Sequence, residues 1–185
     1  KKLYGLNNYY LDLIKLIDRN NLPSAIMLTG KKGQGKFTLV HHLLSYYFDK
    51  KNYDNQSKII TEKNILYQDI KNNFNSNIFY FNCVSRNVKI EEIRKLRSDL
   101  QKSSINNLKR FVIFDDVEYL SENCINALLK TIEEPTVSNN FVLINNKNNS
   151  ILDTLKSRTI EINIFVKNKE RIEIIENLVL DFEID

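Results

Sequence analysis

The sequence predicts an α/β domain in which a parallel sheet is flanked by helices on both faces, a three-layer αβα arrangement. Short apolar runs rich in β-branched and aromatic residues alternate with longer stretches that have helical spacing. Such runs are typical of buried parallel strands, and their alternation with helices indicates a doubly wound sheet. At 185 residues the chain is long enough for one domain of this kind.

These patterns place four strands and three helices. The expected strands are Ala25–Leu28, Ile78–Phe81, Phe111–Phe114 and Phe141–Ile144. The expected helices are Lys36–Phe48, a stretch marked by Ile90, Ile93, Leu96 and Leu100, and a stretch marked by Ile125, Leu128, Leu129 and Ile132. The third helix has Ser121 as its predicted N-cap and Pro135 as its stop.

The rest of the chain is expected to form an insertion and a C-terminal helix. The polar segment Asp49–Asn77 is interpreted as a variable surface insertion with a helix around Ile65–Ile70. A further helix is expected from Asn168 onward, so residues 1–165 are assigned to the α/β domain and residues 166–185 to a second unit. The chain starts at Lys1 and has its one methionine inside a predicted strand, so we expect a fragment.

Composition excludes several classes of protein. No apolar run approaches the ~20 residues that span a bilayer, and no secretory signal opens the chain, so a cytoplasmic protein without a membrane segment is expected. Cys83 and Cys124 lie far apart and match neither a disulfide framework nor a zinc site. The net charge is +4, and the Lys and Arg residues are scattered among Asp and Glu rather than gathered in one block. This disfavours a nucleic-acid-binding module that acts alone.

A glycine-rich loop follows the first predicted strand and precedes the first helix. Its sequence is Gly30-Lys31-Lys32-Gly33-Gln34-Gly35-Lys36. Glycines let backbone N–H groups face a β-phosphate, the helix N-terminus adds a positive dipole, and Lys36 can reach the β- and γ-oxygens. The loop therefore predicts a phosphate site, with Gly30, Gly33, Gly35, Lys36 and Thr38 as candidate nucleotide-binding residues.

The residues that should complete the ATP chemistry are altered. A hydroxyl that holds Mg²⁺ is expected directly after Lys36, but Phe37 stands there and Thr38 follows one residue later, rotated by about 100° on the helix. Asp115 and Asp116 end the third predicted strand, where a carboxylate can hold Mg²⁺ and a second acid can polarise water. Asp116 is a methylene shorter than the usual Glu. The alternative interpretation is that the two acids cap the following loop.

Several segments together resemble the clamp-loader subunits of the AAA+ ATPases. The run Asn126-Ala127-Leu128-Leu129-Lys130-Thr131-Ile132-Glu133-Glu134-Pro135 is similar to the NALLKxxEEP signature of that family. Leu22-Pro23-Ser24-Ala25 resembles its LPHA segment, Ile90–Leu96 its IxxIRxL helix, and Ser157-Arg158-Thr159 its Ser-Arg-Cys motif. Order and spacing agree from about Leu22 to Ile162.

The resemblance implies a subunit of the bacterial DNA polymerase III clamp loader, which loads the sliding clamp on primed DNA. It implies that Arg158 reaches into a neighbouring nucleotide site as an arginine finger. The alternative for an isolated arginine is a partner for a helix dipole. Asn145 is the first candidate for the sensor residue, with Asn146 left open, and residues 166–185 would begin the helical lid domain.

Within the family, the delta-prime type matches better than the ATP-hydrolysing gamma/tau type. The gamma/tau type has a zinc-binding cysteine cluster and intact GK[ST] and Asp-Glu motifs, whereas this chain has Phe37 and Asp116. The expected partners are gamma/tau and delta subunits, with the clamp and DNA reached through the complex. Binding of ATP or ADP with Mg²⁺ stays open, own hydrolysis is expected to be weak or absent, and an active gamma/tau-like ATPase is the alternative.

Overall fold

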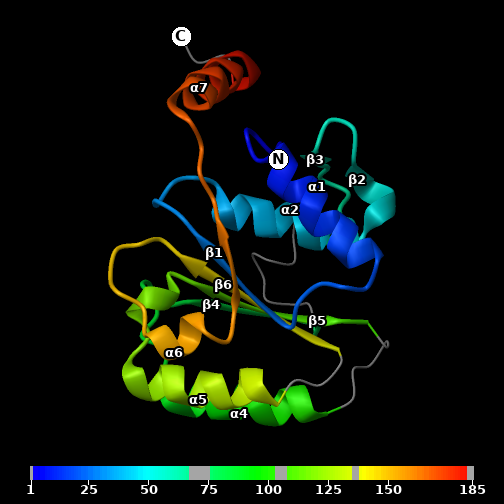
Figure 1. The fold of residues 1–185 in the computed structure, drawn as a ribbon. Coiled ribbons are helices and arrows are strands. Elements are labelled where there is room, and N and C mark those ends of the chain that lie inside the picture. Colours follow the sequence, from blue (N-terminus) through cyan, green and yellow to red (C-terminus); the bar gives the residue numbers. More distant parts are fainter. Residues whose placement is uncertain (1, 67–75, 103–107, 135–137, 183–185) are drawn as a thin grey trace.

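The structure is a sheet covered by helices on both faces, as the sequence predicts. The computed structural model describes residues 2–66, 76–102, 108–134 and 138–182. Five parallel strands are ordered β4-β5-β6-β1-β7, with bounds β1 Ala25–Thr29, β4 Ile78–Asn82, β5 Arg110–Asp115, β6 Asn139–Asn145 and β7 Ile160–Asn163. Helices α1 and α2 lie on one face, and α4, α5 and α6 lie on the other (Figure 1). Their bounds are α1 Asn7–Asp18, α2 Lys36–Phe48, α4 Ile90–Gln101, α5 Glu122–Glu133 and α6 Asp153–Lys156.

The four predicted strands and three predicted helices are confirmed. Helix α2 has the predicted bounds, and α5 begins after Ser121, whose Oγ accepts a hydrogen bond from Cys124 N at 3.3 Å. Its predicted stop, Pro135, lies outside the described residues. Strands β1 and β6 are buried along their whole length because each has a strand on both sides and helices on both faces.

Strand β7 and helix α1 were not anticipated from the sequence. Strand β7 lies at the edge of the sheet, so Ile160 and Glu161 are exposed and the strand lacks a buried apolar run. Helix α1 buries Tyr10, Leu13 and Ile14 and contacts α2. The edge position of β7 explains why its apolar signal is weak.

Alternation along the strands divides the core into two clusters. In β1, Ile26 and Leu28 belong to the cluster shared with α1 and α2, whereas Ala25 and Met27 belong to the cluster shared with α4 and α5. Successive side chains of a strand point to opposite faces, so each strand contributes to both clusters. The same alternation decides which polar side chains face α2 where the strands end.

The insertion Asp49–Asn77 contains short elements. A 3₁₀ turn η1 at Lys50–Asn52 leads into an antiparallel pair, β2 at Tyr53–Asp54 and β3 at Ile59–Ile60. Residues 65 and 66 are helical, and residues 67–70 of the helix expected at Ile65–Ile70 lie outside the described residues.

Helix α7, Asn168–Phe182, begins at the residue where the sequence predicts it. It lies at the same end of the molecule as the N-terminal segment (Figure 1). Asp181 Oδ2 accepts hydrogen bonds from Lys2 Nζ at 2.7 Å and from Tyr4 Oη at 2.6 Å. None of the helices in the described ranges combines the length and apolarity needed to cross a membrane.

Candidate functional site

The glycine-rich loop lies between the carboxyl end of β1 and the N-terminus of α2. Helix α2 begins at Lys36, and Gly35 forms its N-cap in the left-handed region with φ +79°. Gly33 also has a positive φ of +85°. Residues with a Cβ adopt these conformations at a cost, so the loop needs glycine at both positions.

Gly30 is required for a different reason. A Cβ at this position would lie 2.5 Å from the backbone oxygen of Ile164 and 2.5 Å from Gln34 Oε1. Its N–H donates to Asn145 O at 3.1 Å, which fastens the start of the loop to β6. The three candidate glycines therefore serve two needs, which are close packing at Gly30 and positive φ at Gly33 and Gly35.

Lys36 is buried, and its ammonium group bonds the loop itself. Its Nζ donates to Gly30 O at 2.7 Å and to Lys31 O at 2.8 Å. Burial lowers the pKa of Lys36 to about 8, although the negative charges of Glu118, Asp115 and Asp116 act in the opposite direction. The N–H groups of the first turn of α2 have no acceptor within the helix. Together with Lys36 they form a cationic, donor-rich cradle that fits the phosphates of a nucleotide.

Asp115 is the last residue of β5, and a tyrosine of the neighbouring strand reaches it. Tyr80 Oη donates to Asp115 Oδ2 at 3.3 Å and accepts from Asn82 Nδ2 at 3.4 Å. Burial and the adjacent Asp116 raise the pKa of Asp115 above its ordinary value. The hydroxyl of Tyr80 therefore occupies part of the hydrogen-bonding capacity of this carboxylate.

Asp116 has a left-handed backbone conformation, with φ 56° and ψ 46°, and is buried. Asn146 Nδ2 donates to its Oδ1 at 2.6 Å, and Lys32 Nζ lies 3.6 Å from its Oδ2. The carboxylate is thus held between the loop after β6 and the glycine-rich loop. The structure brings Lys36, Asp115 and Asp116 close enough that both acids act on the pKa of Lys36.

The residues around Asp115 do not fit the usual magnesium site. Phe37 places an aromatic ring on the first turn of α2, 5.3 Å between centroids from the ring of Tyr80. The position that should supply a metal-holding hydroxyl is therefore apolar, and Asp115 already bonds Tyr80. Thr38 is half-buried and lies about 100° further round the helix. The loop and Lys36 therefore have the donors that phosphates require, whereas the metal position lacks its hydroxyl ligand.

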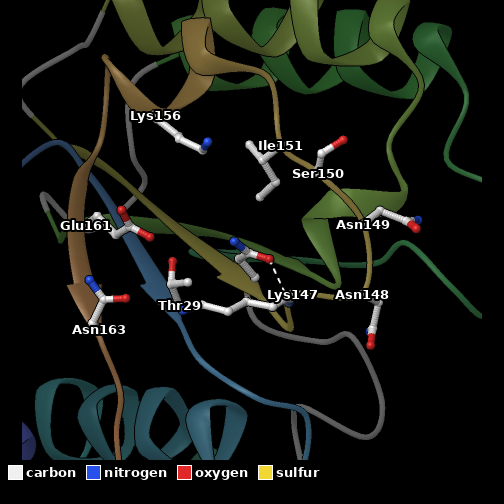
Figure 2. A pocket seen from close by; sticks show the side chains of 10 residues that line it. Thr29, Lys147, Asn148, Asn149, Ser150, Ile151, Lys156, Glu161 and Asn163 are labelled. Carbon is white, nitrogen blue, oxygen red and sulfur yellow. Dashed lines mark hydrogen bonds between the residues drawn. The ribbon is translucent and has the colours of Figure 1, made fainter.

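Asn145 and Asn146 have different surroundings. Asn145 Oδ1 accepts from Lys147 N at 2.8 Å, and its side chain lines a polar cavity of about 600 Å³ on the face opposite α2. Figure 2 shows this cavity, with Thr29 and Glu161 among its walls. Asn146 contacts the acidic pair instead. The structure therefore places Asn146, rather than the first candidate Asn145, beside Asp116.

Sequence reasoning assigned no role to Glu118, which is a buried part of the site. Its carboxylate accepts from Asn146 N at 3.1 and 3.2 Å, and from Asn148 N at 3.3 Å and Asn148 Nδ2 at 3.2 Å. Glu118 thereby fixes the loop that follows β6. An acid directly after a buried strand, next to Asp115 and Asp116, was the available signal.

Arg158 lies just after α6, on the helix-α5 side of the sheet. Its Nε donates to Glu133 Oε1, and its Nη1 donates to Thr154 O at 3.1 Å and Ser157 Oγ at 3.3 Å. The side chain is 39% exposed. The guanidinium is therefore oriented by Glu133 while part of it stays open to solvent.

Comparison with known proteins identifies the family. The family model described as "DNA polymerase III, delta subunit" matches residues 6–168. DNA polymerase III subunit gamma of Buchnera aphidicola subsp. Acyrthosiphon pisum is 30% identical over 122 residues, which is 64% of this chain and 32% of that protein. The chain thus spans about a third of the length of this relative.

Solved structures show the same fold. A DNA polymerase III gamma subunit-related protein of Thermotoga maritima has a TM-score of 0.61 at 21% identity, over 91% of this chain and 52% of that one. The Thermotoga maritima RuvB Holliday junction branch migration motor has a TM-score of 0.59 at 18% identity, over 97% and 51%. The Bacillus subtilis DNA clamp loader delta protein has a TM-score of 0.51 at 15% identity, over 93% and 47%. The fold is that of an AAA+ domain, and the chain belongs to the DNA polymerase III, delta subunit family.

Proposed function

We propose that this chain is the AAA+ domain of a delta-prime-type clamp-loader subunit, which supplies Arg158 to the nucleotide site of a neighbouring subunit. The observation that supports this most is the presentation of Arg158. Glu133 accepts from Nε, Thr154 O and Ser157 Oγ accept from Nη1, and the side chain is 39% exposed. A guanidinium oriented in this way can stabilise charge that develops on a γ-phosphate across a subunit interface.

The chain's own nucleotide site supports a subunit that binds nucleotide and hydrolyses it weakly or not at all. Gly33, Gly35 and Lys36 keep the phosphate cradle. Phe37 and the bond between Tyr80 and Asp115 remove the metal-holding arrangement. Asp116 bonds Asn146 and lies near Lys32, so it is not free to polarise a water molecule.

The second candidate function is an active, gamma/tau-like ATPase. The 30% identity with a DNA polymerase III gamma subunit and the intact Lys36 favour it. In that case the isolated protein would turn over ATP, and Lys36→Ala would abolish the turnover. Absence of turnover in the wild-type protein would support the delta-prime assignment.

We infer the partners and setting from the family. The subunit would assemble with gamma/tau and delta subunits, and would reach the sliding clamp and primed DNA through the complex in the cytoplasm. Residues 1–165 would form the AAA+ domain, and α7 within residues 166–185 would begin the helical lid. The exposed side chains of Ile172, Ile175 and Leu180 on α7 are consistent with a helix that packs against further helices.

The test is the ATP turnover of the reconstituted complex with Arg158→Ala. The expected result is intact assembly with lower turnover, because loss of one transition-state donor costs on the order of 10²-fold at the affected site. Glu133→Ala should give a smaller loss, since the guanidinium remains but loses its anchor. Arg171→Ala, which changes an exposed arginine of α7, is the matched control. Unchanged turnover with Arg158→Ala would refute the role in trans.

A further inference from the structure

The position next to Lys36 is filled by an aromatic pair rather than by a metal ligand. Phe37 and Tyr80 lie 5.3 Å apart between ring centroids, at a tilt of 54°. Phe37 also lies 6.4 Å from the ring of His41. An aromatic ring offers no oxygen to Mg²⁺, which requires hard oxygen ligands in near-octahedral geometry.

Asp115, the carboxylate expected to hold the metal at the same position, already accepts a hydrogen bond. Strand register pairs Asn82 with Asp115, which brings Tyr80, two residues earlier in β4, within reach of the carboxylate. Tyr80 Oη accepts from Asn82 and donates to Asp115, so this hydroxyl has a defined orientation. A metal at Asp115 would have to displace that bond and would gain no ligand from Phe37.

Lysines supply positive charge that a metal ion would otherwise bring. Lys31 and Lys32 are exposed on the loop, and the buried ammonium of Lys36 is at its centre. Lys147 lies close enough to Lys36 to influence its ionisation. The four ammonium groups outnumber the three carboxylates of Glu118, Asp115 and Asp116 that also act on Lys36, so positive charge remains to offset part of the charge of a nucleotide.

We propose that this loop binds ATP or ADP free of Mg²⁺, with Phe37 and Tyr80 excluding the metal and the lysines taking over its electrostatic role. The inference rests on the proposed function, in which the loop from Gly30 to Lys36 holds nucleotide phosphates. It adds the form of the ligand, which is the uncomplexed nucleotide. Excess Mg²⁺ should then weaken binding, because Mg²⁺ complexes free ATP in solution and so removes the form that the site takes.

The experiment is a titration of the protein with a fluorescent ATP analogue, once in excess Mg²⁺ and once in EDTA. The expected dissociation constant is about tenfold or more higher in excess Mg²⁺ than in EDTA, because Mg²⁺ draws the nucleotide into a complex for which no protein group supplies a metal ligand. Equal or tighter binding in Mg²⁺ would overturn the inference and leave the nucleotide site standing. Absence of binding in both solutions would overturn the inference together with the nucleotide site, while the complex assay on Arg158 would still decide the role in trans.

A double variant tests the cause. Phe37→Ser with Tyr80→Phe restores a hydroxyl after Lys36 and frees Asp115, so Mg²⁺ should tighten its nucleotide binding by about tenfold relative to EDTA. Tyr47→Phe is the matched control, because it removes the hydroxyl that accepts from Lys109 N at the far end of α2 and should leave the ratio unchanged. A folded double variant whose nucleotide binding is weakened by Mg²⁺ as much as that of the wild type would overturn the assigned cause. If that variant does not fold by circular dichroism, the wild-type comparison decides.

Discussion

At the scale of single residues, Lys36 shows how burial changes the pKa of a candidate phosphate-binding group. Its ammonium is removed from solvent and bonded to two carbonyl oxygens of its own loop. Desolvation disfavours the charged form, and the nearby Glu118, Asp115 and Asp116 favour it, with a net lowering of the pKa to about 8. A lysine with this pKa loses its positive charge as the pH rises through about 8.

Nucleotide affinity should therefore depend on pH around 8. The charged form of Lys36 is present below its pKa and is lost as pH rises through about 8, so affinity for ATP should fall between pH 7 and 9.5. Titrations across this range measure it. The fall should be absent in Lys36→Met, which should bind weakly at every pH. A wild-type affinity that is flat from pH 7 to 9.5 would contradict the assignment of Lys36 to the phosphates.

At the scale of elements, the loop after β6 is held by one carboxylate from the turn after β5. Glu118 lies in the 3₁₀ turn η2, Val117–Tyr119, and accepts hydrogen bonds from Asn146 and Asn148. Both partners are about 30 residues away in the chain. The contact joins two adjacent strand ends and fixes the backbone from which Asn146 reaches Asp116.

Replacing Glu118 with Ala should release this loop. The lost charge-assisted hydrogen bonds should lower the free energy of unfolding by about 1–2 kcal/mol, partly offset by relief of repulsion with Asp115 and Asp116. Hydrogen exchange at the amides of Asn146 and Asn148 should accelerate, while the amides of β1 stay protected. Glu118→Gln should retain part of the protection because it keeps one acceptor oxygen. Glu176→Ala, an exposed substitution on α7, is the control, and unchanged exchange in Glu118→Ala would contradict the positioning role.

At the scale of the whole molecule, the sheet is stabilised by a separate apolar cluster on each face. Phe114 is fully buried and stacks on Phe81 with ring centroids 4.7 Å apart and planes 9° apart. It packs in the cluster shared with α4 and α5 and immediately precedes Asp115, the last residue of β5. The packing of this cluster therefore also supports the site.

Phe114→Ala should cost about 3–5 kcal/mol of unfolding free energy, because it combines lost burial with a cavity. That is a large share of the free energy of unfolding of a typical folded domain, which is about 5–15 kcal/mol. Phe165→Ala, at a phenylalanine that is 65% exposed, should change stability by about 0.5 kcal/mol or less. Urea denaturation measures both. A Phe114→Ala variant as stable as Phe165→Ala would contradict the assignment of Phe114 to the core.

Most of the fold could be predicted because its central elements have strong local patterns. Strands β1, β4, β5 and β6 are apolar runs, and helix α2 follows a glycine-rich loop whose residues are consecutive in sequence. Edge strand β7 and helix α1 were missed because an exposed edge needs no continuous apolar run, and because amphipathic spacing does not say against what a helix packs.

The sequence by itself determined the glycine-rich loop, the acidic strand end and the family resemblance, because each depends on short runs of residues that are neighbours in the chain. Only the tertiary structure decided that Tyr80 bonds Asp115, that Asn146 rather than Asn145 meets Asp116, and that Glu133 orients Arg158. These partners are 25 to 35 residues apart, and they meet because of strand register and helix packing. A local sequence pattern predicts neither strand register nor helix packing, because both follow from how the whole sheet is assembled.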